Sequence, residues 1–408
     1  MRQGLDQHLT GLIVGDTTGA DTAISNGNNG TTSTLTPTND LAAAAIGAKN
    51  ATAKPFLKIV YPTTQLPDRV HSLLVLDSSF NPPTKAHMGM MVQTITSLMS
   101  PSMPFDCCLL LLSTLNADKP PLLSTPATLP LVDTPHHHST SNAATTPAYT
   151  STLDRLEMMC SLVDIVPHNL PCHVALINQP NFVDKLAVIQ KTWPTISTVY
   201  FVLGCDTLQR FFNKKYYLPD STLESTESSK GTTTHINNTE NGGSCVTVGN
   251  ILAESFFDRG GRIICAGRQL KDAAKITDAT THILTQGSII SDALHSEALL
   301  PSCIDKIIEL SRWTTDSSGS SVDRQASLYV HEKFKLDSIS SSQVRDLFAR
   351  YWSALANYGE GATPSAATQS QHTPDSHASS DSILSELSHL VDEAVISYIL
   401  KHHLYKPA

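Results

Sequence analysis

One segment, residues 73–87, constrains the fold of this chain more than any other. It reads LLVLDSSFNPPTKAH: an apolar run that ends at Asp77, a short loop with two prolines, and the start of a helix. A buried strand that turns sharply into a helix directs free backbone N–H groups and the positive end of the helix dipole at one spot. The segment therefore predicts an anion site at the end of a strand.

Thr84 and His87 stand three positions apart in this segment. On a helix they share a face, so a hydroxyl and an imidazole converge where a polyphosphate would lie. Neither group is suited to being a nucleophile there. The simpler alternative is that His87 satisfies local hydrogen bonds at an ordinary helix start.

A second apolar run, residues 199–206, ends in Gly-x-Asp. Gly204 would let the backbone approach a sugar, and the Asp206 carboxylate can accept from both hydroxyls of a ribose, as acidic residues do beyond the strands of dinucleotide-binding folds. The alternative for Asp206 is a helix N-cap.

A third segment, residues 339–345, reads ISSSQVR. Ser340, Ser341 and Ser342 at a helix start would supply hydroxyl and N–H donors, and Arg345, one turn later, would bring a forked cation to the same anion. Read alone, the serines are a common helix start and Arg345 could be a solvated surface charge.

In this order, the three segments resemble the nucleotidylyltransferase superfamily, and most closely its nicotinamide mononucleotide adenylyltransferase branch. Its signature is a strand followed by G-[ST]-F-x-P-x-[HT]-x-x-H. Ser79, Phe80, Asn81, Pro82, Thr84 and His87 match it, whereas Ser78 stands where most members carry Gly. Residues 339–345 resemble the ISSTxxR segment, and residues 390–405 resemble the last helix of the family. The departures look like a divergent fungal subgroup.

The resemblance implies roles for individual residues. Catalysis would involve His87, Arg345 and Lys119. Lys119 is included because the family often places, after its second strand, a lysine that contacts substrate phosphate. Two aromatic residues flank a pyridine ring in this branch, and the corresponding places fall at Phe182 and Tyr217; core packing is the alternative for both. ATP would be bound by Ser79, Phe80, Thr84, His87, Gly204, Asp206, Ser340, Ser341, Ser342 and Arg345.

The implied activity is ATP-dependent adenylyl transfer to nicotinamide mononucleotide, which gives NAD⁺ and pyrophosphate. The chain shows no activated Ser, Cys or Lys nucleophile, so we expect direct in-line attack on the α-phosphorus of ATP, accelerated by positioning and charge neutralisation. Mg²⁺ would be held mainly by the ATP phosphates and water. The histidine run 136–138 has no preset geometry, and no protein metal site is expected.

Two alternatives remain at this stage. One is an adenylyl or cytidylyl transferase for another phosphorylated acceptor, such as phosphopantetheine. The other is an ATP-binding or ATP-hydrolysing regulatory protein that keeps the fold. A class I aminoacyl-tRNA synthetase is disfavoured, because the chain has no KMSKS-like segment and no basic anticodon-binding region.

Short apolar runs that alternate with helical segments predict an α/β fold with a doubly wound, Rossmann-like parallel sheet and the site at the carboxyl ends of its strands. The strands are expected at 72–77, 106–113, 173–178, 198–203, 262–266 and 328–331. The helices are expected at 85–98, 152–166, 182–193, 207–212, 251–257, 340–350 and 382–403.

Composition sets the domain organisation. We expect a disordered tail at 1–54 and one catalytic domain at 55–408, with polar, low-complexity insertions near 125–150, 220–244, 314–325 and 359–381. The net charge of −9 argues against nucleic-acid and membrane partners, so ATP and the mononucleotide are the expected partners. With no signal pattern and no membrane-length apolar run, the cytoplasm or nucleus is expected. The eight cysteines have no CxxC spacing and read as reduced thiols.

Overall fold

The computed structural model describes residues 54–62, 66, 68–98, 105–115, 150–218, 247–266, 286–310, 339–359 and 380–407. The expected tail and insertions lie outside these ranges except at their edges, so the domain organisation stays a prediction. The expected strand at 328–331 also lies outside them.

The centre of the molecule is a seven-stranded sheet in the order β1-β4-β3-β2-β5-β6-β7. The strands are β1 (Leu57–Tyr61), β2 (Ser72–Ser78), β3 (Cys107–Ser113), β4 (Cys172–Ile177), β5 (Thr198–Gly204), β6 (Gly261–Ala266) and β7 (Ile307–Leu310). β1 runs antiparallel to β4, and every other pair is parallel. The six parallel strands have the doubly wound order, which confirms the predicted fold class, and the order reverses between β2 and β5.

Continuous apolar sequence explains why these strands are central. Leu74 and Leu76 of β2 belong to one hydrophobic cluster, and Leu73 and Val75 belong to the other, so alternate side chains pack on opposite faces. All four are almost completely buried. A strand covered on both faces needs apolar residues at successive positions, which is the pattern of parallel sheets.

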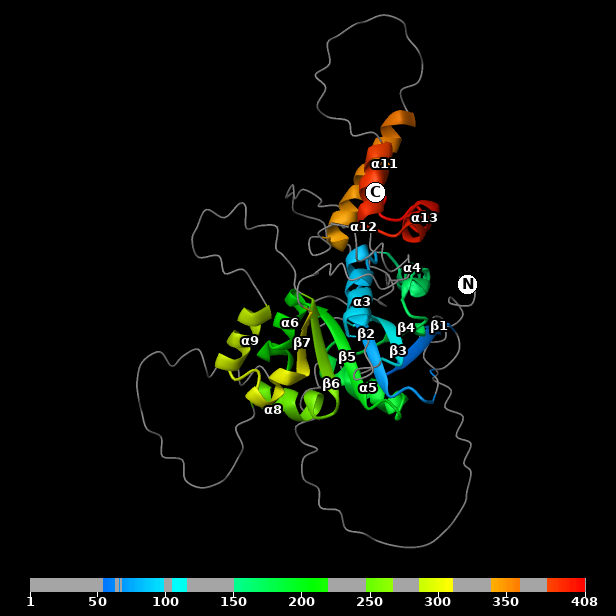
Figure 1. Ribbon diagram of the computed structural model, residues 1–408. Helices are drawn as coiled ribbons and strands as arrows, with labels where there is room; N and C mark the ends of the chain where they lie inside the picture. Colours follow the sequence, from blue (N-terminus) through cyan, green and yellow to red (C-terminus); the bar gives the residue numbers. More distant parts are fainter. Residues whose placement is uncertain are drawn as a thin grey trace, which may run out of the picture.

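Helices cover both faces of the sheet (Figure 1). One cluster includes residues of α3 (Lys85–Leu98), α4 (Thr152–Cys160), α11 (Ser341–Gly359), α12 (Ser380–Leu390) and α13 (Glu393–Lys401). The other includes residues of α5 (Phe182–Thr192), α6 (Cys205–Phe211), α8 (Val248–Leu252), the π-helical turn η5 (Ala253–Phe257) and α9 (Gln286–His295). Short 3₁₀ turns are η2 (Val163–Ile165), η3 (Lys214–Tyr216) and η7 (Pro301–Lys306).

The structure corrects several expected elements. The helix expected at 382–403 is two helices, because the Asp392 side chain accepts from the Ala394 N–H at 2.9 Å and caps the start of α13. The helix expected at 152–166 ends at Cys160. β1, β7 and α9 were not expected from the sequence.

The described cysteines agree with the sequence: all seven are free thiols, and six of them are buried.

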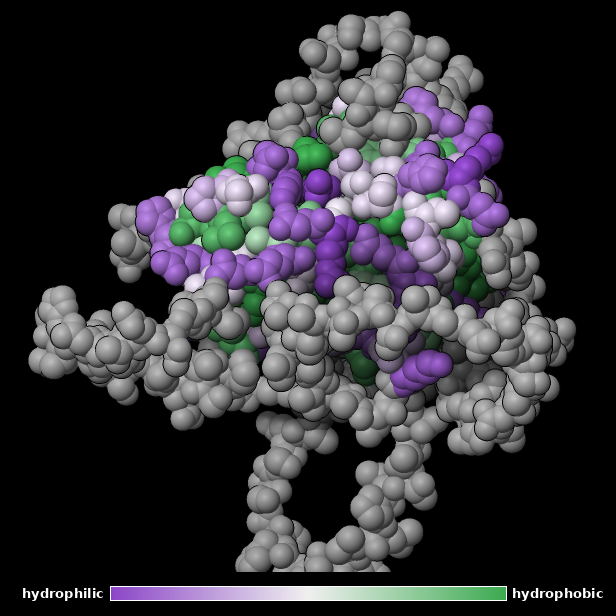
Figure 2. Space-filling model, turned by 90° about the horizontal axis from the view of Figure 1, so that it is seen from below, coloured by the Kyte–Doolittle hydropathy of each residue, from purple (hydrophilic) through white to green (hydrophobic). Residues whose placement is uncertain are grey.

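The described surface carries few large apolar side chains. Figure 2 shows hydrophilic residues spread across the coloured part of the face seen from below. Ile304 and Leu355 are the large hydrophobic residues exposed in the described ranges. Among the helices that are described, none has the length and apolar character needed to cross a membrane.

Gly260, in the turn before β6, gives a test of the backbone. Its φ is +88°, and a Cβ there would lie 2.0 Å from the Ser197 carbonyl oxygen. We expect Gly260→Ala to lower the free energy of unfolding by about 2 kcal/mol or more, measured by urea denaturation. Gly204→Ala is the control: a Cβ there meets no atom within 4 Å, so the loss should stay below about 1 kcal/mol. Equal losses would contradict this account of the turn.

Candidate functional site

The loop between β2 and α3 has an unusual backbone. Phe80 has a φ of 42°, in the left-handed region that costs a non-glycine residue of order 1–3 kcal/mol, and the Asn81–Pro82 peptide bond is cis. The Phe80 side chain is completely buried, with its ring centroid 5.2 Å from that of His87. The whole residue, backbone included, is buried, so Phe80 supports the shape of the loop from inside.

The direction of the Phe80 N–H follows from its neighbour. The Ser79 carbonyl oxygen accepts a hydrogen bond from Arg155 Nη1 at 3.2 Å. In a planar trans peptide the C=O and the next N–H point in opposite directions, so the Phe80 N–H points away from Arg155. Arg155 thus fixes the orientation of the peptide between Ser79 and Phe80.

His87 is fixed at the start of α3 by both ring nitrogens. Nδ1 accepts from the Thr84 backbone N–H at 3.0 Å and lies 2.8 Å from Thr84 Oγ1, whereas Nε2 lies 2.9 Å from Ser78 Oγ. A backbone N–H can only donate, so Nδ1 is the unprotonated nitrogen and Nε2 carries the proton. The imidazole therefore caps the helix and also directs an N–H donor toward the end of β2.

The side chain of Asn81 joins the loop to two distant segments. Its Oδ1 accepts from Thr150 Oγ1 at 2.6 Å and from the Tyr405 hydroxyl at 2.9 Å. Arg155 Nε donates to Thr150 Oγ1 at 3.2 Å. All four residues are buried, so each of these polar groups depends on its partners for hydrogen bonding. The sequence indicated Asn81 only as a motif position and gave no sign of Thr150 or Tyr405.

The predicted serine–arginine segment packs against the same loop. Ser341 Oγ donates to the Pro82 carbonyl at 2.8 Å, and Arg345 Nη1 donates to the Asn81 carbonyl at 2.6 Å. Arg345 Nη2 also donates to Ser342 Oγ at 2.9 Å. Ser340 accepts from the Gln343 N–H and so caps α11. The structure thus brings the first and third segments together, and Arg345 is not a solvated surface charge.

Gly204 and Asp206 lie at the switch point of the sheet. β5 runs parallel to β2, with Leu76 opposite Val202, so both strands end at the same edge of the sheet. Gly204 is the N-cap of α6 and Asp206 is in its first turn, so the reading of Asp206 as the N-cap is wrong. The space beside Gly204 Cα is open, which leaves the backbone accessible.

A cavity of about 200 Å³ opens beside the loop. Its walls come from the end of β2 and the start of the loop, from the start of α5, and from α6 and the turn after it. The residues that line it include Ser79, Phe182 and Tyr217 of the predicted set. Two predicted acceptor residues therefore share one cavity with the predicted phosphate loop.

Phe182 and Tyr217 also pack in the protein core. The Phe182 ring meets Phe201 and Phe211 edge-on, with centroids 5.3 and 5.8 Å apart. The Tyr217 hydroxyl donates to the Phe211 carbonyl at 2.8 Å, and burial raises the pKa of Tyr217, which keeps that hydroxyl protonated. These contacts therefore hold both aromatic side chains in fixed positions in the cavity wall.

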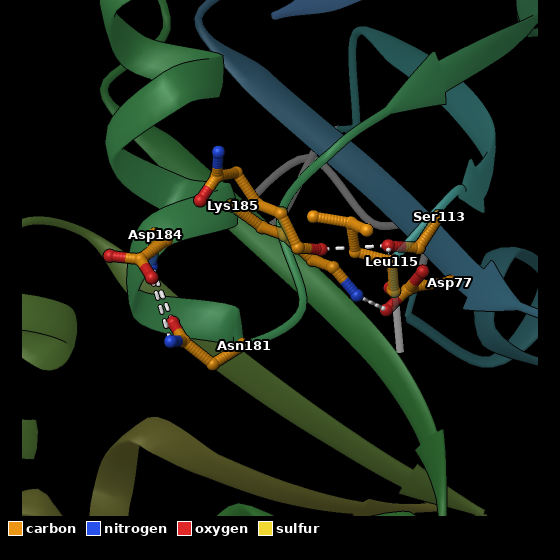
Figure 3. Close-up of polar contacts among 7 residues, drawn as sticks. Asp77, Ser113, Leu115, Asn181, Asp184 and Lys185 are labelled. Atoms are coloured by element: carbon orange, nitrogen blue, oxygen red, sulfur yellow. Dashed lines mark hydrogen bonds and ion pairs between the residues drawn. The ribbon is translucent and has the colours of Figure 1, made fainter. Parts of the chain in front are cut away.

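Sequence reasoning missed an ion pair in the cavity wall, between Lys185 of α5 and Asp77 at the end of β2 (Figure 3). The pair is buried, and the Lys185 Nζ lies 5.0 Å from the centroid of the Phe182 ring. Nearby, Asn181 and Asp184 bond to each other at the start of α5. Burial raises the pKa of Asp184, and the hydrogen bond from Asn181 opposes that shift.

One predicted site residue and the question of a metal site remain to be described. Lys119 lies outside the described residues. Within the described ranges, no group of three or more His, Cys, Asp or Glu side chains could hold a metal ion. The donors around the loop are hydroxyls, N–H groups and guanidiniums, a set that suits anions rather than a cation.

Tyr405 tests the link between the chain end and the loop. Burial raises its pKa to about 12, so the folded protein keeps the hydroxyl protonated at a pH where the unfolded chain loses that proton. We expect Tyr405→Phe to cost about 1 kcal/mol of unfolding free energy at pH 7, through the lost bond to Asn81. From pH 10 to pH 11 this advantage of wild type should shrink by roughly 1 kcal/mol, because only wild type has this group to titrate. A pH-independent difference in urea unfolding would contradict the assignment.

Comparison with known proteins supports the resemblance over part of the chain. No protein-family model matches the sequence. A curated Schizosaccharomyces pombe protein, described as "Putative nicotinamide mononucleotide adenylyltransferase", is 35% identical over 146 residues, which is 36% of this chain. This match confirms the resemblance for the aligned part. The aligned part spans 44% of the relative's length, less than half.

Among solved structures, the chain is similar to Plasmodium falciparum nicotinic acid mononucleotide adenylyltransferase complexed with NaAD, with a TM-score of 0.39 and 12% identity, over 82% of this chain and 97% of that one. The Plasmodium falciparum enzyme complexed with APC gives a TM-score of 0.36 and 11% identity over the same shares. The order of the strands in the sheet defines the fold of this chain.

Proposed function

We propose that this protein transfers the adenylyl group of ATP to nicotinamide mononucleotide, giving NAD⁺ and pyrophosphate. The observation that carries the proposal is the contact of α11 with the loop before α3. Arg345 and Ser341 donate to the loop carbonyls of Asn81 and Pro82, across more than 250 residues of sequence. If the first and third sequence segments resembled the family only by chance, there would be no reason for them to contact each other in the folded chain.

The ATP triphosphate would lie against this loop. Its donors would be the Nε2–H of His87, the hydroxyl of Ser79 and the guanidinium of Arg345, while the Thr84 hydroxyl donates to His87 Nδ1 and holds that ring in place. Arg345 uses two of its five N–H donors in the bonds to Asn81 and Ser342, so it can hold the loop and still offer donors to a phosphate. The ribose would bind at the edge formed by Gly204 and Asp206, one strand away.

The acceptor would occupy the cavity beside the loop. Its walls combine the Ser78–Ser79 end of the loop with the aromatic residues Phe182 and Tyr217. A phosphorylated acceptor with a flat ring fits both features, because the phosphate can face the loop while the ring lies among aromatic side chains. Lys119 is proposed as a further partner of the acceptor phosphate.

The reaction would be a single in-line displacement. An oxygen of the acceptor phosphate attacks the α-phosphorus of ATP, the new P–O bond forms, and the bond to the β-phosphate oxygen breaks to release pyrophosphate. His87, Ser342 and Arg345 would offset charge and hold the oxygens in line, whereas Thr84 and Ser341 would position His87 and the loop through their own hydrogen bonds. Mg²⁺, carried by the phosphates and water, would add charge neutralisation on the leaving group.

An acceptor panel tests the proposal. Purified full-length protein is incubated with ATP and Mg²⁺ and, in parallel, with nicotinamide mononucleotide, nicotinate mononucleotide, phosphopantetheine or no acceptor. We expect pyrophosphate together with NAD⁺ from the nicotinamide mononucleotide. Transfer to phosphopantetheine alone would show that the proposed acceptor is wrong. In a parallel set with CTP in place of ATP, a reaction that occurs only with CTP would show that the proposed nucleotide donor is wrong. ATP hydrolysis without transfer would favour the regulatory alternative.

The phosphate site is tested by two substitutions. We expect His87→Ala and Arg345→Ala each to lower kcat by roughly a hundredfold or more, because each removes charge stabilisation in the transition state. Both act on one group of oxygens, so the double variant should lose less than the product of the single losses.

Arg350→Ala is the matched control for the arginine, because Arg350 is exposed on the same helix. It should keep wild-type turnover, and circular dichroism should show all variants folded. Near-normal turnover in either single variant would remove that residue from the site.

A further inference from the structure

The ion pair between Lys185 and Asp77 stands in the wall of the proposed acceptor cavity. The side chains are 4% and 8% exposed, respectively. Burying two charges costs desolvation free energy that their attraction does not always recover, and an apolar pair of similar size often serves stability equally well. A buried pair that lines a cavity is therefore a candidate for recognising a ligand.

The pair joins two parts of the cavity wall, the end of β2 with the loop after it and the start of α5. Asp77 directly precedes Ser78 and the loop, and Lys185 lies one turn into α5, over the ring of Phe182. Figure 3 shows the Lys185 side chain reaching from α5 to Asp77. The ammonium therefore sits beside the aromatic wall, where the proposed function puts the acceptor ring.

The hydrogen-bonding capacity of the pair exceeds what the protein uses. An ammonium has three N–H donors, and a carboxylate accepts at about four positions. Among the described residues, Lys185 Nζ donates to Asp77 and to no other group. Side by side at the cavity, the two groups can offer a ligand one donor and one acceptor.

We propose that Lys185 and Asp77 determine acceptor specificity by recognising a neutral carboxamide on the ring. The Lys185 N–H donates to the carboxamide oxygen, and the Asp77 carboxylate accepts from its amino group. A carboxylate in the same place would gain from Lys185 but would be repelled by Asp77. This inference rests on the proposed function and names the chemical group of the acceptor that the cavity recognises.

The two charges act in opposite directions, so their removal gives opposite signs. The measured quantity is kcat/KM for nicotinate mononucleotide divided by kcat/KM for nicotinamide mononucleotide, at saturating ATP and Mg²⁺. Asp77→Asn should raise this ratio at least tenfold, because the Lys185 charge then acts alone on the carboxylate. Lys185→Gln should lower the ratio, because the Asp77 charge then acts alone.

A purely structural pair predicts a different result. Loss of stability or of cavity shape would lower kcat/KM for both acceptors and leave the ratio unchanged. Lys191→Gln is the matched control, because it makes the same charge change at an exposed position on α5, and its ratio should equal that of wild type. An unchanged ratio in both pair variants, or a shift of the same sign, would overturn the inference.

A conservative variant covers the case in which the single variants do not fold. Lys185→Arg keeps the ion pair but presents a forked guanidinium that matches a carboxylate, so the ratio should rise at least threefold. An unchanged ratio in this variant would overturn the inference. If wild type transfers to neither mononucleotide, the proposed function itself fails; if it transfers and the ratios do not move as stated, only the specificity assignment fails.

Discussion

The conformation of the loop before α3 depends on hydrogen bonds that distant residues donate to the backbone carbonyl groups of the loop. Arg155 binds the Ser79 carbonyl from one side, and Arg345 binds the Asn81 carbonyl from α11. Each guanidinium is a rigid, permanently charged donor, so these bonds are stronger than neutral ones and fix direction as well as distance. The strained backbone at Phe80 is kept because the surrounding contacts determine it more strongly than the local preference opposes it.

The sheet determines where this loop lies. β2 is the strand at which the chain order reverses, and its neighbour β5 ends at the same edge of the sheet. The connections after these two strands therefore leave on opposite faces, with α3 in one hydrophobic cluster and α6 in the other. Such a divergence leaves a crevice outside the strand ends, and the side chains of both loops border it. The cavity and the anion donors follow from the topology, before any particular side chain is considered.

Local signals explain what the sequence predicted well. Apolar runs gave the central strands, since strands buried on both faces need apolar residues at successive positions, and the Thr84–His87 spacing gave the start of α3. β1 and β7 were not predicted, because they are short strands at the two edges of the sheet and a charged residue interrupts the apolar run in each, Lys58 in β1 and Glu309 in β7. The break between α12 and α13 was not predicted, because it depends on one N-cap residue, Asp392, inside a long amphipathic pattern.

Partners distant in sequence explain what it could not predict in the site. The apolar pattern near Tyr405 shows that the residue is buried, yet nothing in the pattern identifies Asn81, 324 positions away, as its partner. The same holds for Lys185, whose place on α5 reads as an ordinary helical lysine until β2 places Asp77 beside it. Burial makes these polar pairs mutually dependent, because each group would otherwise lose its hydrogen bonds to water without replacement. The motifs of the site are therefore local in sequence, whereas the contacts that assemble them, and the ion pair to which we assign specificity, join positions far apart in the chain.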